Sequence, residues 1–230
     1  MQPMTSPIDL QREDDVFVLR MAHGENRFNL DFVAAINRAL DEVESSTGAA
    51  ALVTVGEGKF YSNGLDLDWM AGPGRSQAAE CVNHVHALFG RMLAFPMITV
   101  AALNGHVFAA GAMLAISHDF RVMRTDRGYF CLPEVDIQIP FTPPMAALIQ
   151  ARLSKFTAHE AMVTGKRYTA SEALANQIVH EIASDADVLA KARAIAKAHA
   201  NKSRATVGAI KQGAYREALA LLALKTTPKT

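Results

Sequence analysis

Two kinds of hydrophobic pattern alternate along this chain of 230 residues. Short apolar runs, several of them rich in β-branched residues, predict strands. They span residues 15–22, 50–56, 98–102, 120–123 and 129–132. Longer stretches with apolar residues three or four positions apart predict helices. They span residues 30–44, 76–95, 111–117 and 145–153. Strands that alternate with helices predict the α/β class.

The second half of the chain differs from the first because almost all of it is expected to be helical. After about residue 143, a strand is predicted at residues 179–182, and the rest has helical spacing. The change is a shift from α/β to α without a linker between two domains. We therefore expect a core over residues 1–190 and C-terminal helices over residues 191–230.

Charge and cysteine content narrow the function classes. Lys and Arg number 23, and so do Asp and Glu, which gives a net charge of zero. Because phosphate binding needs a basic surplus, we expect no nucleic-acid partner. Two cysteines are too few for a disulfide framework, which favours a reducing compartment. No long apolar stretch predicts a membrane span or a signal peptide, so the expected location is the cytoplasm.

Basic residues are concentrated near the C-terminus. Residues 191–230 contain nine Lys and Arg but one acidic residue, Glu217. A solvated basic helix face explains this, and so does a contribution to binding a phosphate-bearing ligand. The sequence leaves both interpretations open.

Two glycine-containing loops are candidates for binding. Residues 60–66 and 104–111 each follow a predicted strand, and the second loop opens a helix. Small residues let the backbone approach a ligand, and free N–H groups at a helix N-terminus favour negative charge. Two converging N–H groups would form an oxyanion hole. Two ordinary strand-to-helix turns would give the same pattern.

Glu134 is the candidate base. It follows a predicted strand and lies among Leu132, Val135 and Ile137. A carboxyl group in apolar surroundings has a raised pKa and can act as a base near neutral pH. A solvated surface glutamate is the plainer alternative. Asp136, two residues further on, would share its strand face or serve as a structural hydrogen-bond acceptor. No spacing of His, Cys or acidic residues predicts a metal site.

Four segments together resemble one family. They are residues 51–66 (ALVTVGEGKFYSNGLD), 99–119 (TVAALNGHVFAAGAMLAISHD), 129–137 (YFCLPEVDI) and 164–182 (TGKRYTASEALANQIVHEI). In this order and spacing they resemble the crotonase superfamily, the enoyl-CoA hydratase/isomerase family. The resemblance implies a spiral of ββα units with a C-terminal helical region, assembled as a homotrimer or a hexamer.

The same resemblance implies a coenzyme A thioester as substrate, with no permanently bound cofactor. The N–H groups of Leu65 and Gly111 would form the oxyanion hole. Backbone carbonyls of one stretch would face the adenine part of coenzyme A. That stretch comprises Ser62, Asn63, Gly64, Leu65 and Asp66.

The number of carboxylates separates the reactions of the family. Hydratases use two glutamates, and here the first position is Leu114 while the second is Glu134. Moving a double bond from C3 to C2 needs one base, so the pattern resembles Δ3,Δ2-enoyl-CoA isomerases of fatty-acid oxidation. The alternatives are a hydratase or another crotonase-type reaction and, in a different class, a non-catalytic acyl-CoA-binding or RNA-binding homologue. Guesses for an apolar acyl pocket, each with core packing as its alternative, are Leu114, Trp69, Met70, Phe141 and Met145.

Overall fold

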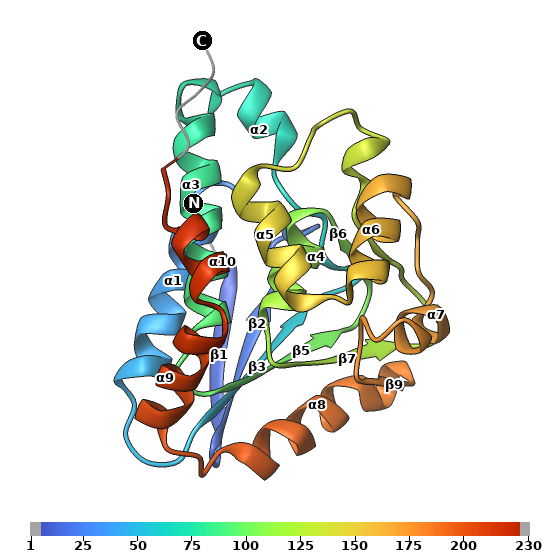
Figure 1. Ribbon diagram of the computed structural model, residues 1–230. Coiled ribbons are helices and arrows are strands. Elements are labelled where there is room, and N and C mark those ends of the chain that lie inside the picture. The colour runs from blue at the N-terminus through green and yellow to red at the C-terminus, as the bar shows by residue number, and fades with distance from the viewer. Residues whose placement is uncertain (1–5, 226–230) are drawn as a thin grey trace, which may run out of the picture.

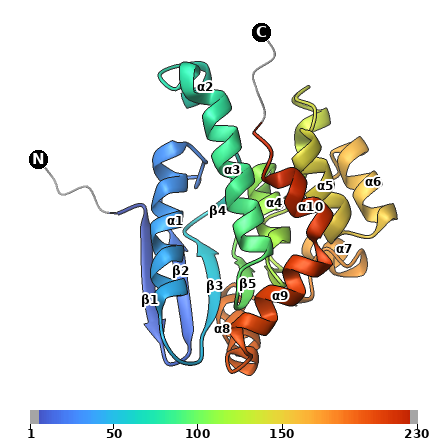
Figure 2. The same cartoon turned by 60° about the vertical axis from the view of Figure 1, so that its left-hand side comes forward.

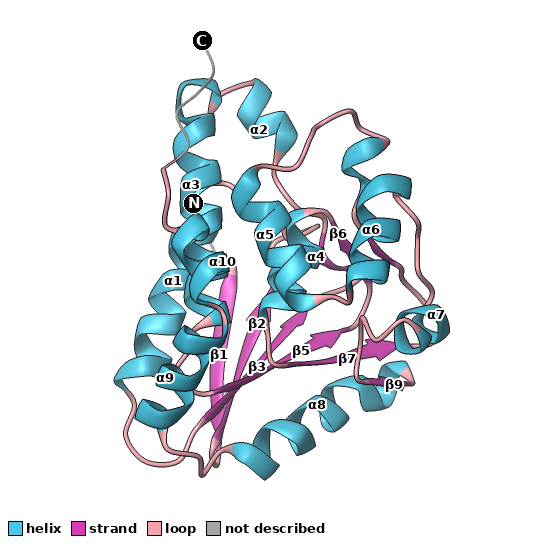
Figure 3. Cartoon of the chain, in the orientation of Figure 1, coloured by secondary structure: helices cyan, strands magenta, loops and turns pink. Residues whose placement is uncertain are grey.

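The computed structural model describes residues 6–225 and contains a six-stranded main sheet (Figures 1 and 3). Its strands in spatial order are β1 (Ile8–Glu13), β2 (Val16–Met21), β3 (Ala51–Gly56), β5 (Ile98–Leu103), β7 (Phe120–Arg124) and β9 (Glu181–Ala183). β1 and β2 are antiparallel, and all the other neighbours are parallel. Parallel neighbours require crossover connections, which the helices of the chain supply.

Three of these strands are each followed by a short strand of a second sheet and then by one or more helices. The short strands, which pair in parallel, are β4 (Phe60–Ser62), β6 (His106–Phe108) and β8 (Phe130–Cys131). The helices that follow them are α2 (Leu67–Ala71) and α3 (Ala78–Leu93), α4 (Ala110–Ser117), and α5 (Pro143–Arg152). Short 3-10 turns at Arg75–Gln77 and Pro133–Val135 precede α3 and α5. This arrangement confirms the predicted fold class, a spiral of ββα units.

The main sheet is covered on both faces. Successive side chains of a strand point to opposite faces, so Leu52 packs in the large core with α1 (Leu30–Ser45) and α3, whereas Val53 packs in a smaller core beneath α8 (Asp185–His199). Figure 1 shows α8 along one side of the sheet and α1, α3 and α4 on the other. The α1 helix begins as predicted, because the side chain of Asn29 accepts a hydrogen bond from the Phe32 N–H.

The C-terminal part is helical, as predicted. It comprises α6 (Lys155–Thr164), α7 (Ala170–Ala175), β9, α8, α9 (Arg204–Ala214) and α10 (Arg216–Leu222). The α10 helix packs on α3 and α5 (Figure 2). The expected boundary at residue 190 lies inside α8, and the residues of α8 on both sides of it pack in the same core.

Four strands differ from the prediction. β1 has one buried residue, Ile8, and so lacks the apolar pattern of a core strand. β4 and β6 lie within segments that the sequence predicts to be loops, because three residues are too few to show a period. The predicted strand at 129–132 is shorter than expected, and Glu134 lies in the 3-10 turn after it.

Candidate functional site

The two glycine loops pack directly against each other. Gly64 has a φ of +86°, and a Cβ there would lie 2.8 Å from the Cβ of Ala109. In return, a Cβ on Gly111 would lie 2.6 Å from the carbonyl oxygen of Ser62. Both distances are too short for a real side chain, so each glycine lets the opposite loop approach. This mutual packing brings residue 65 and the start of α4 together.

The N–H of Leu65 is free to bind a ligand. On either side of it, the Phe28 N–H donates to the Gly64 carbonyl at 2.8 Å, and the Asp66 N–H donates to the Phe28 carbonyl at 3.0 Å. The N–H of Leu65 has no acceptor among residues 6–225. An unpaired N–H group beside a cavity is the donor that an oxyanion hole requires.

Gly111 supplies a second free N–H group. It is the second residue of α4, and the first hydrogen bond into this helix runs from the Met113 N–H to the Ala109 carbonyl at 3.1 Å. The N–H of Gly111 therefore belongs to the unpaired donors of the first turn, at the positive end of the helix. Ala109 has a φ of +50°, which turns the chain sharply from β6 into α4.

The Glu134 carboxyl group is buried and ready to take a proton. The residue is 7% exposed, and its Oε2 atom has no hydrogen-bond partner within the described chain. Burial raises the pKa of Glu134 to about 7, because water no longer stabilises the charged form. The carboxyl group can therefore exchange a proton with a substrate near neutral pH.

Leu65 and Glu134 line one cavity of about 310 Å³, and so does Ala110, the residue before Gly111. Leu65, Ala109 and Ala110, from the two glycine loops, line it together with Glu134. Most of the remaining wall is apolar, and it includes Leu67, Pro133, Ile137, Ile139, Pro140 and Met145. A largely apolar cavity with a few convergent polar groups is the usual form of a small-molecule site.

A polar network that the sequence did not reveal lies at the same cavity. Arg27 makes ion pairs with Glu25 at 2.6 Å and with Asp68 at 2.7 Å. The Asn63 side chain donates to Glu25 at 2.8 Å. Arg27, Asn63 and Asp68 line the cavity, and the Asp68 side chain is 87% exposed. Glu134 is thus the buried carboxylate among the residues that line this cavity.

Of the stretch from residue 62 to residue 66 that is predicted to face the adenine, Ser62, Gly64 and Asp66 do not line the cavity. Ser62 is buried, and its hydroxyl donates to the Asn26 carbonyl at 2.7 Å. The Asp66 side chain accepts from the Trp69 N–H at 3.1 Å and so caps α2. Gly111 also lies one residue behind Ala110, which forms the cavity surface.

Of the guessed acyl-pocket residues, Met145 lines the cavity. Phe141 lines a neighbouring cavity that also touches Glu134. Leu114 is 2% exposed and belongs to the core, and Trp69 covers Gly74, whose Cβ would meet its ring. Leu114 therefore packs in the core, which was the alternative to a place in the acyl pocket.

The comparisons with known proteins agree with this geometry. A model of the enoyl-CoA hydratase/isomerase family matches residues 11–227. The protein belongs to this family. Within it, the chain is 36% identical over 236 residues to peroxisomal enoyl-CoA delta isomerase 2 of Arabidopsis thaliana, covering 96% of this chain and 98% of the relative. It is 37% identical to enoyl-CoA delta isomerase 3 of the same plant over 76% of each chain.

Solved structures of the family have the same fold. The apo enoyl-CoA isomerase of Mycobacterium tuberculosis superimposes with a TM-score of 0.88 at 26% identity, over 95% of each chain. The human mitochondrial delta3-delta2-enoyl-CoA isomerase superimposes with a TM-score of 0.85 at 22% identity, over 93% of this chain and 85% of the human one.

Neither a metal-binding cluster nor a membrane-crossing helix is found in the part of the chain that the structure describes. Among residues 6–225, no group of three or more His, Cys, Asp or Glu side chains is arranged to hold a metal ion. None of the helices in that range combines the length and the apolar character that crossing a membrane requires.

Proposed function

We propose that the protein is a Δ3,Δ2-enoyl-CoA isomerase that moves the double bond of a 3-enoyl-CoA to the 2-position. The observation that carries the proposal is a single buried carboxylate, Glu134, in the same cavity as two loops with free main-chain N–H groups. The names of the Arabidopsis relatives support the same reaction.

The reaction needs one proton carrier and one site for negative charge. The thioester oxygen would accept hydrogen bonds from the N–H groups of Leu65 and Gly111. Glu134 would remove a proton from C2, which leaves a dienolate whose charge rests on that oxygen. The same carboxyl group would return the proton to C4, and the double bond would then lie between C2 and C3. Each oxyanion donor is typically worth about 3–4 kcal/mol, and the general base roughly 10²–10⁴-fold in rate.

The position of Leu114 favours isomerisation over hydration. Hydration requires activation of a water molecule as well as protonation of carbon, which two carboxylates divide between them. Leu114 stands where the second carboxylate of a hydratase would be, and it is buried in the apolar core. An apolar wall also limits water at the dienolate, so that the proton returns to carbon.

The substrate's coenzyme A portion would leave the cavity past the stretch from Ser62 to Asp66, with backbone carbonyls facing the adenine.

No permanently bound cofactor is needed for this chemistry. Assembly as a homotrimer or hexamer and a cytoplasmic location remain predictions. Both cysteines, Cys81 and Cys131, are free and buried, which is compatible with a reducing compartment.

Paired thioesters test the proposal. The purified protein is incubated with matched 2-enoyl-CoA and 3-enoyl-CoA substrates of several lengths, and the conjugated ultraviolet absorbance is followed. Isomerisation of the 3-enoyl thioester creates this absorbance, whereas hydration of the 2-enoyl thioester removes it. Binding of acyl-CoA without turnover of either substrate would instead indicate a non-catalytic binder.

The Glu134→Gln variant tests the assigned base. We expect turnover of the 3-enoyl thioester to fall by about 10²–10⁴-fold while the fold persists, because the amide has no proton acceptor of suitable pKa. Asp136→Asn is the matched control, since Asp136 is exposed two residues away. A Glu134→Gln protein as active as the Asp136→Asn protein would refute the assignment.

A further inference from the structure

Positively charged side chains bind the C-terminal end of α4, the end opposite Gly111. The Arg152 Nε donates to the Ile116 carbonyl at 2.7 Å, and its Nη2 donates to the His118 carbonyl at 2.7 Å. Arg121 Nη1 also donates to the His118 carbonyl, at 3.0 Å. Two guanidinium groups thus bind carbonyls where the negative end of the helix dipole lies.

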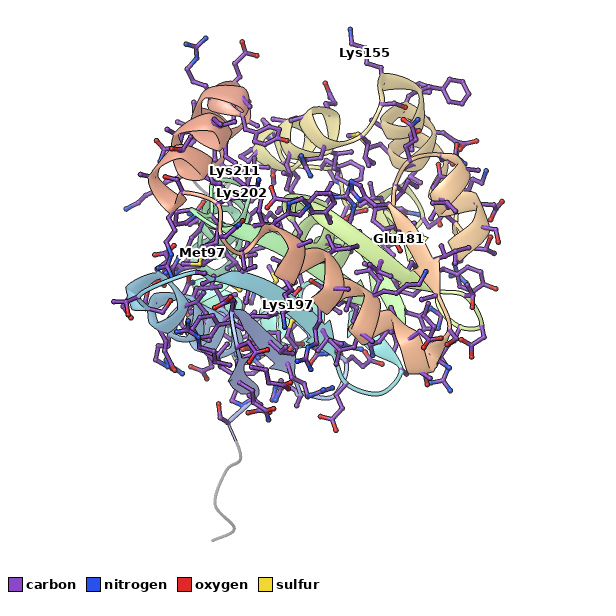
Figure 4. All side chains as sticks on the ribbon, turned by 90° about the horizontal axis from the view of Figure 1, so that it is seen from below. Met97, Lys155, Glu181, Lys197, Lys202 and Lys211 are labelled. Atoms are coloured by element: carbon purple, nitrogen blue, oxygen red, sulfur yellow. The ribbon has the colours of Figure 1, made fainter. Side chains whose placement is uncertain are left out.

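The surroundings of these arginines carry a surplus of positive charge. Lys211 of α9 (labelled in Figure 4) is buried and makes an ion pair with Asp119 at 2.6 Å. Its remaining donors are used by the carbonyls of Phe95 and Met97, at 3.0 and 2.8 Å. Asp119 is therefore already matched by Lys211, and the charges of Arg121 and Arg152 remain uncompensated.

The histidine next to the arginines is neutral and adds no charge. His118 Nδ1 lies 2.8 Å from the Leu114 carbonyl, which only accepts hydrogen bonds, so this nitrogen carries the proton. Its Nε2 then accepts from the Thr54 hydroxyl at 2.9 Å, and that hydroxyl in turn accepts from Tyr61 at 2.8 Å. Burial lowers the pKa of His118 to about 4, so it stays neutral at pH 7.

Burial makes the charge of Arg121 effective over a distance. The residue is 2% exposed, and the field of a buried charge is screened far less than that of a surface charge. The helix between the arginines and Gly111 has eight residues, which corresponds to about 12 Å at 1.5 Å per residue. The negative end of such a short, buried helix would oppose an oxyanion at its other end.

We propose that Arg152 and Arg121 are positioning residues that act electrostatically on the oxyanion hole through α4. By neutralising the negative end of the helix, they leave its positive end at Gly111 to act on the thioester oxygen. The inference rests on the proposed function, since it assigns these cations to the stabilisation of the dienolate. Arg152 also contacts Tyr215 between α9 and α10, so the C-terminal helices take part in holding the charge in place.

A pair of substitutions at residue 152 separates charge from shape. Arg152→Lys keeps the positive charge but loses the forked hydrogen bonds, whereas Arg152→Gln retains a hydrogen-bond donor and loses the charge. We expect Arg152→Gln to lower kcat by about three- to tenfold with KM changed less than about twofold. Arg152→Lys should retain most of kcat. Arg124→Gln is the control, because Arg124 makes its ion pairs with the exposed carboxylates of Asp126 and Asp185.

Equal losses of kcat in the Lys and Gln variants would overturn the proposal, because they would show that the hydrogen-bond fork matters and the charge does not. An unchanged kcat in a folded Arg152→Gln protein would overturn it as well. The same Lys and Gln pair at Arg121 supplies the comparison if Arg152→Gln does not fold.

A second measurement separates this inference from the proposed function. The carbonyl stretch of a bound, saturated acyl-CoA labelled with ¹³C at its thioester carbon reports polarisation without any turnover. We expect its shift to lower wavenumber to be smaller in Arg152→Gln than in wild type and to be kept in Arg152→Lys. An identical stretch in all three proteins contradicts the inference. Absence of isomerisation by a wild-type protein that shows the expected shifts contradicts the proposed function alone.

Discussion

The groups assigned to the reaction are of two kinds: main-chain N–H groups of the two glycine loops, here called the main-chain wall of the cavity, and the side chain of Glu134, here called the side-chain wall. The N–H groups of Leu65 and Gly111 are held by two loops so close that Gly64 and Gly111 leave no room for a Cβ. Glu134 lies in a short 3-10 turn, and the segment after it is exposed. The proposed function of the main-chain wall therefore depends on how closely the two loops pack, whereas that of the side-chain wall depends on the carboxyl group of one residue.

This difference explains how one fold can host several reactions. Oxyanion binding by main-chain donors places no demand on the side chain at residue 65, which is a leucine here. In the proposed mechanism the choice of reaction depends instead on side chains, namely the carboxyl group of Glu134 and the absence of a second carboxyl group at Leu114. A substitution in the main-chain wall should therefore damage fold and activity together, whereas one in the side-chain wall should separate them.

The largest combined effect is expected for Gly111→Ala in the main-chain wall. The added methyl group would lie 2.6 Å from the Ser62 carbonyl oxygen, so the loops must separate. We expect a loss of about 1–3 kcal/mol in the free energy of unfolding and about 10²-fold in kcat/KM. Urea unfolding and the isomerase assay measure the two effects.

Gly213→Ala is the matched control for that experiment. Gly213 lies in α9, and a Cβ there would meet nothing within 4 Å. Alanine should stabilise the helix by roughly 0.5–1 kcal/mol without changing activity. Similar behaviour of the two alanine variants would mean that the loops do not depend on their close approach.

In the side-chain wall, titration of the Glu134 carboxyl group should have a smaller effect, seen as a pH dependence of the protein's free energy of unfolding. Burial raises the pKa of Glu134 from 4.5 to about 7, so the folded state holds its proton more tightly than the unfolded state. The free energy of unfolding of the wild type should therefore fall as pH rises from about 4.5 to about 7, by up to roughly 3 kcal/mol from this group.

Glu134→Gln removes that dependence because its amide does not titrate. The stability of the variant relative to wild type should increase between pH 4.5 and pH 7 and stay constant above that range. Thermal unfolding of both proteins across pH measures the difference. A difference that does not vary with pH would mean that the carboxyl group is solvated in the folded protein.

The smallest effect concerns two glutamines with left-handed backbones. Gln138, four residues after Glu134, and Gln177, far along the chain, both have a φ of +58°. Glycine adopts this conformation without a steric penalty, so each Gln→Gly variant should gain up to about 1 kcal/mol in stability. Only Gln138→Gly should alter KM, because Gln138 lines the neighbouring cavity that also touches Glu134. An equal change of KM in Gln177→Gly would contradict the division into walls.

The long elements of the fold could be predicted because their patterns are local. The apolar face of α1 and the β-branched run of β3 are visible in the sequence. β4 and β6 could not be found in this way, because each is defined by pairing with a strand far along the chain. The edge strand β1 buries Ile8 alone and leaves no apolar pattern.

The parts of the candidate site that lie within sequence motifs could be predicted. The parts that are formed by contacts between distant segments could not. Glu134 and the glycine loops follow from family-like segments. The network of Arg27 with Glu25 and Asp68 joins residues up to 41 positions apart, and no sequence signal indicated it. The chemical environment of Glu134 was anticipated from its apolar neighbours, although Val135 and Ile137 are themselves exposed. Its burial instead comes from its position at the cavity between distant segments.

The most direct test of the central claim follows the transferred hydrogen. A 3-enoyl-CoA carrying deuterium at C2 is converted by wild-type protein and by Glu134→Gln, and mass spectrometry locates the deuterium in the first product formed. A single carboxyl shuttle predicts deuterium at C4 in the wild-type product and almost no product from the variant. Loss of deuterium to water, with hydrogen from water at C4 and equal rates for both proteins, would contradict the account.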